Sequence, residues 1–194
     1  IGEKLGHSFS TLIHNELADY SFVLRELAPS ELGDFMRSDE LDAFCVTIPY
    51  KKDVIPYLDE ISDEAKAIGA VNVVVRKDGK LCGYNTDYFG FEYMLDSANI
   101  NVSGKKALLI GNGGAAATVK AVLADKKIGK IVTVDSKTNS PELLSLHKDT
   151  NIIINASPVG MYPHNQTSAI DLSLFPSCEA VLDIVYNPLR TELM

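Results

Sequence analysis

Hydrophobic and polar positions follow two different patterns along the chain, one in each half. In the second half, short and nearly continuous runs of Ile, Val and Leu alternate with a stretch of helical periodicity. Such runs are typical of parallel strands that are buried on both faces and connected by helices. The strands expected here are Ala107–Ile110, Ile131–Val134, Asn151–Asn155 and Val181–Val185, with a helix over Ala115–Ala124. The pattern therefore predicts an α/β domain built on a parallel sheet.

The first half predicts shorter elements of both kinds. Ser10 is a suitable N-cap for a helix over Thr11–Ala18, in which Leu12, Ile13 and Leu17 share one face. The other expected elements are a strand over Ser21–Arg25, helices over Glu31–Arg37, Asp53–Glu60, Asp63–Ile68 and Tyr88–Ser97, and a hairpin of Val71–Arg76 and Leu81–Tyr84 that turns at Asp78-Gly79. The small, polar stretch Asp96–Gly104 marks the expected boundary between two domains, residues 1–98 and 99–194.

One predicted strand of the first half, Phe44–Ile48, ends in residues that a buried strand does not need. Pro49 has no N–H to donate and stops the ladder of hydrogen bonds. A hydroxyl at Thr47 and an amine at Lys51 stand on either side of this stop. We expect the turn at Pro49 to direct both side chains towards one cleft.

Composition limits the possible partners. The chain has 194 residues, of which 46% are hydrophobic, and a formal net charge of −8 at pH 7. This acidic balance argues against nucleic acid or an anionic membrane surface as the main partner. No apolar run approaches the roughly 20 residues of a membrane span. Three cysteines without a CxxC pair and four histidines without zinc-ligand spacing predict a cytoplasmic protein with no metal site.

Residues 111–116, GNGGAA, fit the pattern G-x-G-x-x-A between a predicted strand and a predicted helix. In this pattern the first glycine permits a tight turn and the second lets a pyrophosphate approach the backbone, at the amino end of the helix. The small Ala116 allows the helix to pack closely on the strand. Glycines before a helix also form ordinary turns, but the strand–turn–helix–strand context favours a dinucleotide site.

Asp135 follows the next predicted strand, where an acidic side chain would bind the ribose hydroxyls of the dinucleotide. It has an equally good interpretation as a loop acid or a helix cap. Ser136 and Lys137 come directly after it, and the cation of Lys137 is suited to a 2′-phosphate. The residues themselves therefore leave NAD and NADP both open.

A dinucleotide site performs hydride transfer, which requires a proton donor or acceptor at the substrate oxygen. The candidates in the first half are Lys51 and Asp87. Taken one at a time, Lys51 is equally well explained as a solvated loop charge and Asp87 as the N-cap of the following helix.

Seven motifs resemble, in the same order, those of the shikimate dehydrogenases. They are GHSFSTLIHN (6–15), VTIPYK (46–51), AIGAVNVVV (67–75), GYNTDYFGF (83–91), IGNGGAAA (110–117), INASPVGM (154–161) and VLDIVYNPLRTEL (181–193). Because the motifs cover nearly all of the chain, the sequence is identified as a member of this family.

The resemblance implies a role for each matching residue. For the substrate these are Ser8, Ser10 and Tyr186 near its carboxylate, Thr47, Asn72 and Asp87 at its ring hydroxyls, and Lys51 as the catalytic lysine with Asp87 as its partner. For the cofactor they are Gly111, Gly113, Gly114 and Ala115 in the nucleotide loop, Asn155, Ala156 and Ser157 beside the cofactor, and the Ile184 backbone near the nicotinamide.

The resemblance also implies the architecture and the reaction. It predicts an N-terminal α/β substrate domain followed by a Rossmann-like doubly wound dinucleotide-binding domain. The expected activity is the reversible reduction of 3-dehydroshikimate to shikimate with NADPH or NADH, by a monomer or a homodimer. The alternatives are an NAD-preferring quinate/shikimate dehydrogenase and, with less support, a ligand-binding relative without turnover, which would not need both Lys51 and Asp87.

Three features depart from the family pattern. Members that prefer NADP carry Asn-Arg-Thr after the second strand of the dinucleotide domain, where this chain has Asp135, Ser136 and Lys137. Family members continue beyond the point matched by Met194, into a segment with a substrate-binding glutamine and helices that return to the first domain. The span from Thr138 to Asn151 is also short for a helix, a strand and their connections.

Overall fold

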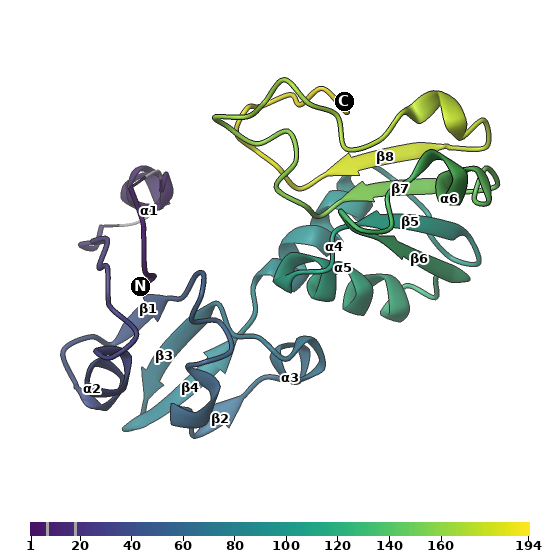
Figure 1. Ribbon diagram of the computed structural model, residues 1–194. Helices are drawn as coiled ribbons and strands as arrows, with labels where there is room; N and C mark the ends of the chain where they lie inside the picture. Colours follow the sequence, from purple (N-terminus) through teal and green to yellow (C-terminus); the bar gives the residue numbers. More distant parts are fainter. Residues whose placement is uncertain (7, 18) are drawn as a thin grey trace. The chain divides into compact units, whose positions relative to one another are not determined.

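The protein consists of two compact units, Ile1–Thr86 and Asp87–Met194, which are described separately. The structure is a computed structural model that describes residues 1–6, 8–17 and 19–194 (Figure 1). In this part of the chain, no helix combines the length and the apolar character needed to cross a bilayer.

The first unit is built on a mixed four-stranded sheet with the strand order β1-β3-β4-β2. The strands are β1 (Ala43–Cys45), β2 (Glu60–Ile61), β3 (Val73–Lys77) and β4 (Lys80–Tyr84), and the helices are α1 (Ser10–Leu17), α2 (Leu32–Arg37), the 3-10 helix η1 (Ile55–Tyr57) and α3 (Asp63–Ile68). Strand β3 pairs antiparallel with β1 and β4, whereas β2 pairs parallel with β4. The predicted hairpin is confirmed: Asp78 and Gly79 have φ angles of +51° and +77°, as a tight two-residue turn requires.

Helix α3 forms where the sequence predicted it because both of its ends are capped. The Ser62 hydroxyl accepts a hydrogen bond from the Ala65 amide, at 3.3 Å, and satisfies one amide of the first turn. Gly69 adopts a left-handed conformation with φ of +69° and ends the helix. Its buried residues, Ala65 and Ile68, face the interior of the unit.

Three predictions for the first unit are wrong in detail. Residues 21–25 form no strand, and an isolated bridge next to them joins Glu26 to Gly2. The helix expected over Asp53–Glu60 is reduced to η1, because the chain extends again to pair β2 with β4. Strand β1 stops at Cys45, before the predicted end at Ile48, although the Val46 amide still donates to the Asn72 carbonyl.

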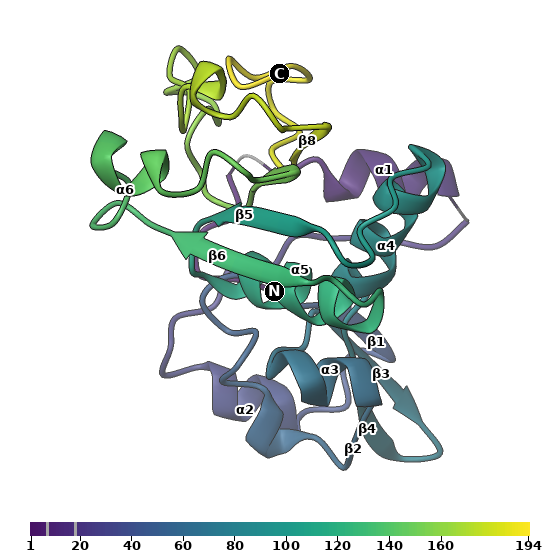
Figure 2. The same cartoon turned by 90° about the vertical axis from the view of Figure 1, so that its right-hand side faces the viewer.

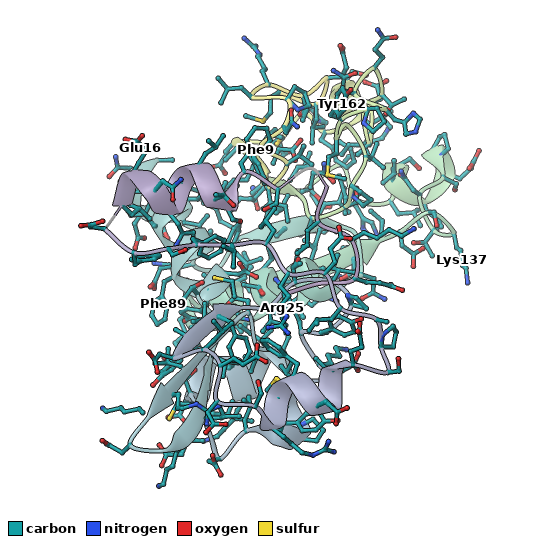
Figure 3. All side chains as sticks on the ribbon, turned by 90° about the vertical axis from the view of Figure 1, so that its left-hand side faces the viewer. Phe9, Glu16, Arg25, Phe89, Lys137 and Tyr162 are labelled. Atoms are coloured by element: carbon teal, nitrogen blue, oxygen red, sulfur yellow. The ribbon has the colours of Figure 1, made fainter. Side chains whose placement is uncertain are left out.

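Helix α1 begins one residue earlier than predicted. Ser10 is its first helical residue, not its N-cap, and the Ser10 amide donates to the Ser8 hydroxyl at 3.2 Å. No residue of α1 is buried: Leu12, Ile13 and Leu17 are 65%, 54% and 70% exposed, so the apolar face predicted from their spacing is mostly exposed. Figure 3 shows Phe9 and Glu16 at the surface around this helix. The predicted last residue, Ala18, lies outside the described residues.

The second unit contains a four-stranded, entirely parallel sheet with the order β6-β5-β7-β8. The strands are β5 (Lys106–Ile110), β6 (Lys130–Val134), β7 (Ile152–Asn155) and β8 (Ala180–Asp183), and the helices are α4 (Asp87–Ser97), α5 (Gly114–Asp125), α6 (Pro141–Ser145) and the 3-10 helix η2 (Leu172–Leu174). Helices α4 and α5 lie on one face of the sheet (Figures 1 and 2). On the other face, Leu144 of α6 and Phe175 pack with Leu108 and Ile153. The predicted Rossmann-like, doubly wound arrangement is confirmed.

Helix α4 belongs to the second unit because it is bonded to α5. The Tyr88 hydroxyl donates to Asp125 Oδ2 at 2.6 Å, and the Lys126 ammonium pairs with Asp96 at 2.7 Å and with Glu92 at 3.4 Å. The units therefore divide after Thr86, whereas the sequence placed the boundary after residue 98.

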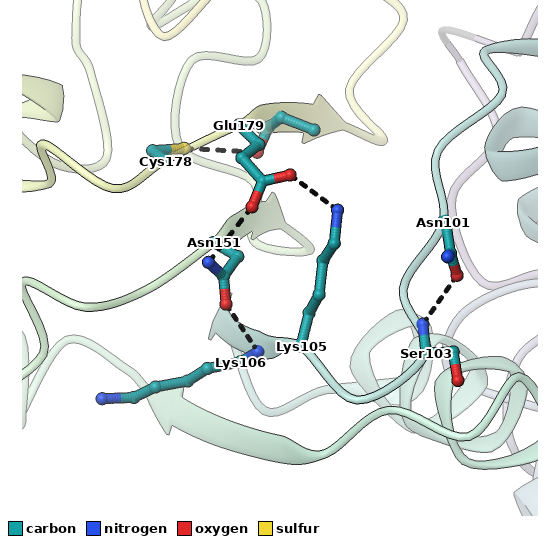
Figure 4. Close-up of polar contacts among 8 residues, drawn as sticks. Asn101, Ser103, Lys105, Lys106, Asn151, Cys178 and Glu179 are labelled. Atoms are coloured by element: carbon teal, nitrogen blue, oxygen red, sulfur yellow. Dashed lines mark hydrogen bonds and ion pairs between the residues drawn. The ribbon is translucent and has the colours of Figure 1, made fainter.

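A polar network fixes the amino ends of three strands of the parallel sheet (Figure 4). The Glu179 carboxylate, just before β8, accepts from the Lys105 ammonium at 2.6 Å and from Asn151 Nδ2 at 3.2 Å. The Asn151 side-chain oxygen accepts from the Lys106 amide at 3.0 Å. The hydrogen bond from Lys105 lowers the pKa of Glu179, so this carboxylate remains charged at neutral pH.

Candidate active site

In the first unit, three predicted substrate residues are brought together by backbone hydrogen bonds. The Asn72 carbonyl accepts from the Val46 amide, next to Thr47, and the Lys51 carbonyl accepts from the Val71 amide, both at 2.8 Å. The backbone therefore places Asn72 next to Thr47 and Lys51, although it lies more than 20 residues further along the chain.

Lys51 is half-buried and lies between two residues that fix its backbone. Tyr50 and Val54 are 1% and 0% exposed, and the Val54 amide donates to the Tyr50 carbonyl. The Tyr50 hydroxyl donates to the Leu27 carbonyl at 2.6 Å. Burial raises the pKa of Tyr50, which keeps the phenol a neutral donor. The backbone at Lys51 is thus held by its buried neighbours Tyr50 and Val54.

Asn72 bonds to Thr86, the residue before Asp87. Its side chain donates from Nδ2 to the Thr86 hydroxyl at 3.0 Å and accepts from the Thr86 amide at 2.8 Å. Thr86 immediately precedes Asp87, the first residue of α4. Nearby, the buried Asn85 donates to the Ala70 carbonyl at 3.0 Å. Asn85 and Thr86 are thus fixed within the first unit, and Asp87 follows them directly in the sequence as the first residue of the second unit.

The remaining predicted substrate residues lie on other elements. Ser8 and Ser10 are half-buried at the start of α1, and Tyr186 is 69% exposed in the loop after β8 of the second unit. Ser8 also serves the local structure, since its hydroxyl accepts from the Ser10 amide.

In the second unit, the glycine loop has the conformation that its sequence predicts. Gly111 has a φ of +108°, and a Cβ on it would lie 2.6 Å from the Ala156 carbonyl oxygen, so only glycine fits there. A Cβ on Gly113 or Gly114 would meet nothing within 4 Å, which leaves the space above both residues open. Ala116 is fully buried, as expected for close packing of α5 on β5, whereas Ala115 is exposed.

The loop lies at the point of the sheet where the strand order changes direction. From β5 the chain crosses to β6 on one side and later to β7 on the other, and ligands of such sheets bind at the carboxyl ends of the strands at this point. The last residues of β5, β7 and β8 are neighbours in register: Ile110 pairs with Asn155, and Asn155 with Asp183. The predicted cofactor residues Asn155, Ser157 and Ile184 therefore lie on the edge that carries the glycine loop.

A buried polar network holds this carboxyl edge together. Asn155 is fully buried, and its side-chain oxygen accepts from the amide and the hydroxyl of Ser157, at 3.1 and 2.7 Å. Its Nδ2 donates to the Val159 carbonyl and to Asp183 Oδ1, and the Ile184 amide donates to the Asn155 carbonyl.

Two residues of this network, Asp183 and Thr191, were not singled out by the sequence. The Thr191 hydroxyl donates to Asp183 Oδ2 at 2.6 Å, and the Val185 amide donates to Asp183 Oδ1 at 2.9 Å. The available signal was an acidic residue at the end of a buried strand, the same signal that selected Asp135.

Asp135 follows β6 at the same edge, and the Gly111 amide donates to the Val134 carbonyl beside it at 2.8 Å. Its Oδ1 accepts from the amides of Lys137 and Thr138, at 2.9 and 3.2 Å, and these bonds lower its pKa. Both interpretations of Asp135 thus remain: it caps its own loop and it lies where a ribose would bind. Ser136 and Lys137 are exposed, and the Lys137 side chain extends outwards (Figure 3).

The edge fits a dinucleotide. The open space above Gly113 and Gly114, the first-turn amides of α5 and the acidic side chain after β6 are the features that such a ligand requires. Within the described residues, no group of three or more His, Cys, Asp or Glu side chains could hold a metal ion.

Residues 1–74 match the family model of the shikimate dehydrogenase substrate binding domain. The whole chain aligns with the shikimate dehydrogenase (NADP(+)) of Clostridium beijerinckii at 39% identity and covers 79% of that protein. The chain belongs to the shikimate dehydrogenase family. It is therefore an NAD(P)-dependent oxidoreductase that acts on a CH–OH group.

Solved structures of shikimate dehydrogenases share this fold. A chorismate mutase/shikimate 5-dehydrogenase fusion protein from Clostridium acetobutylicum is 33% identical, with a TM-score of 0.88 over 99% of this chain and 78% of that one. The shikimate 5-dehydrogenase from Thermus thermophilus, in complex with NADP(H) and shikimate, is 27% identical, with a TM-score of 0.82 over 96% of this chain and 77% of that one. The N-terminal α/β unit and the Rossmann-like unit are thus those of the shikimate dehydrogenases.

Proposed function

We propose that this protein catalyses the reversible reduction of 3-dehydroshikimate to shikimate, with Lys51 and Asp87 as its catalytic pair. The observation that carries the proposal is the conjunction of a substrate-domain match with an open glycine loop at the switch point of a parallel sheet. The solved relative from Thermus thermophilus, a complex with NADP(H) and shikimate, supports the ligand classes.

The substrate is a small polyhydroxylated acid, which requires short donors and acceptors around its ring. We assign Ser8, Ser10 and Tyr186 to its carboxylate, and Thr47, Asn72 and Asp87 to its hydroxyls. Gly113, Gly114 and Ala115 take the pyrophosphate, Asn155, Ser157 and Ile184 border the nicotinamide half, and Asp135, Ser136 and Lys137 face the adenosine ribose. The backbone links among Thr47, Lys51 and Asn72 support the first group, and the register of β5, β7 and β8 supports the second.

The chemistry divides between the cofactor and the chain. When bound, the reduced nicotinamide supplies a hydride for the carbonyl carbon. Lys51 gives its proton to the carbonyl oxygen, which becomes the hydroxyl, and in the oxidation direction it takes this proton back. Asp87 accepts a hydrogen bond from a ring hydroxyl and orients Lys51.

The test is a spectrophotometric assay that crosses shikimate and quinate with NADP⁺ and NAD⁺, with Lys51→Ala protein in parallel. We expect turnover of shikimate that depends on Lys51. Preference for NAD⁺ with quinate accepted would favour a quinate/shikimate dehydrogenase. Ligand binding without turnover in all four combinations would contradict the proposal and indicate a binding protein.

Asp135 gives a separate prediction about the choice of cofactor. Its pKa is lowered, so the carboxylate is charged throughout the neutral range and repels a 2′-phosphate. In Asp135→Asn the side-chain oxygen still accepts from the Lys137 and Thr138 amides, so the loop is retained and only the charge is lost. We expect the ratio of kcat/KM for NADP⁺ to that for NAD⁺ to rise about tenfold, or ~1.4 kcal/mol.

Asp171→Asn is the matched control for this measurement. Asp171 is also an acidic cap, since it accepts from the Ser173 amide at 2.9 Å and has a lowered pKa, but it precedes η2 instead of following a strand of the sheet. Its substitution leaves the cofactor ratio unchanged. An equal shift in both variants, or none in Asp135→Asn, would remove Asp135 from the ribose site.

A further inference from the structure

The carboxylate of Asp183 accepts hydrogen bonds from residues on both sides of it in the sequence. It is the last residue of β8, and it joins the end of β7 to the segment that follows β8. Its Oδ1 accepts from Asn155 Nδ2 at 3.0 Å, at the end of β7, and from the Val185 amide at 2.9 Å, in the segment after β8. Its Oδ2 accepts from the Thr191 hydroxyl at 2.6 Å, near Met194.

Two of the residues that donate hydrogen bonds to Asp183 are buried, and burial strengthens these bonds. Asn155 is 0% exposed and Thr191 is 5% exposed, so both partners lose hydration when the unit folds. Within the described part of the chain, Asp183 has no ion-pair partner, and its charge is balanced by neutral donors alone. Hydrogen bonds to a charged acceptor are about twice as strong as neutral ones, so they fix the two segments firmly.

The segments that Asp183 joins carry predicted cofactor residues. Asn155 in turn accepts hydrogen bonds from the amide and the hydroxyl of Ser157. Val185 lies between Ile184 and Tyr186 in the sequence. Gly160, with φ of +89°, lies against Thr191, which a Cβ on it would meet at 3.3 Å. The glycine loop lies beside this network where Gly111 closely approaches Ala156, but the bonds of Asp183 do not involve the loop.

We infer that Asp183 is a positioning residue that sets the nicotinamide-facing edge of the site, through Asn155 and Val185, and leaves the adenosine half to the glycine loop. The inference rests on the proposed function for the identity of the ligand. Asp183 thus acts on one half of the binding site. Its loss lowers the affinity that the nicotinamide ring contributes and leaves the affinity for the rest of the nucleotide unchanged.

The experiment compares the ligands of a pair, one with the nicotinamide and one without it, and uses two such pairs. Dissociation constants are measured by calorimetry for NADP⁺ and 2′-phospho-ADP-ribose, and for NAD⁺ and ADP-ribose, on the whole protein. In Asp183→Ala, the Val185 amide and the Thr191 hydroxyl lose their acceptor, and Asn155 Nδ2 keeps only its bond to the Val159 carbonyl. We expect the dinucleotide to bind about tenfold more weakly, as leaving buried donors unsatisfied implies, while the ligand without nicotinamide changes less than about twofold.

Asp183→Asn and Thr191→Val keep the test valid if Asp183→Ala folds poorly. An Asn oxygen still accepts from Asn155 and Val185, and its amide donates to the Thr191 hydroxyl, which can also accept. This variant therefore retains the affinity ratio of the paired ligands. Thr191→Val removes one donor at nearly constant shape, and we expect it to lower the ratio about threefold, between the other two variants.

Glu179→Ala is the matched control. Glu179 also bridges neighbouring segments of the sheet, through Lys105 and Asn151, but at the amino ends of the strands. Equal weakening of both ligands in the Asp183 or Thr191 variants would show a general structural role and overturn the inference, as would an unchanged ratio in Thr191→Val and Asp183→Ala. Failure of the wild-type protein to bind any of these nucleotides would contradict the proposed function instead.

Discussion

Replacement of Lys51 by alanine is expected to lower kcat for shikimate oxidation by about 10²- to 10⁴-fold, the range that a positioned acid–base group contributes. The backbone contacts of this turn are retained in the variant, since the neighbouring Tyr50 and Val54 are buried and the Lys51 carbonyl still accepts from the Val71 amide. The loss is therefore one of proton transfer. Steady-state kinetics at saturating substrate and cofactor measure it.

Lys52→Ala is the control, because Lys52 is the adjacent, exposed lysine. It removes the same charge from the same turn, and we expect kcat within about twofold of the wild type, as for most exposed positions. Calorimetry on Lys51→Ala should give unchanged dissociation constants for the nucleotides. Normal turnover by this variant, or equal loss in both lysine variants, would exclude Lys51 as the proton donor.

The parts of the fold that the sequence predicted well are those fixed by local signals. The strands β5 and β6 and helix α5 follow from apolar runs around a glycine turn, and α3 follows from a Ser62 cap and a left-handed Gly69. The hairpin follows from Asp78-Gly79. In each case the residues that decide the structure lie within the element or next to it, where a sequence pattern can be recognised.

The predictions that failed depended on contacts between distant residues. Apolar residues within 21–25 suggested a strand, but this segment pairs with none of the strands that the structure describes. The compact units also divide at another place than the predicted domain boundary, after Thr86, since Tyr88 bonds to Asp125 in a contact between two helices that no local pattern indicates. The candidate site divides in the same way. The glycine loop could be recognised in the sequence, whereas the network of Asp183 and Thr191 forms only when β7, β8 and the segment after them are adjacent in the fold.

Gly111→Ala is expected to destabilise the second unit by about 3 kcal/mol or more, because strain and steric overlap act together. Its φ of +108° is one that L residues rarely adopt, and the new Cβ would lie 2.6 Å from the Ala156 oxygen and 2.8 Å from its carbonyl carbon. Neither segment can move away freely, since the Gly111 amide donates to Val134 and the Ala156 amide to Ile110, both at 2.8 Å. Urea unfolding followed by circular dichroism, together with hydrogen exchange of β5 amides, measures the loss.

Gly113→Ala separates this structural role from ligand binding in the same loop. Gly113 has a φ of −89°, which alanine adopts without strain, and a Cβ there meets nothing within 4 Å. This variant should unfold at the same urea concentration as the wild type. Its methyl group, however, fills the space that a pyrophosphate needs, so we expect nucleotides with and without the nicotinamide to bind at least about tenfold more weakly, a change of ~1.4 kcal/mol. Unchanged binding in Gly113→Ala would place the pyrophosphate elsewhere, and unchanged stability in Gly111→Ala would contradict the close approach of Gly111 to Ala156.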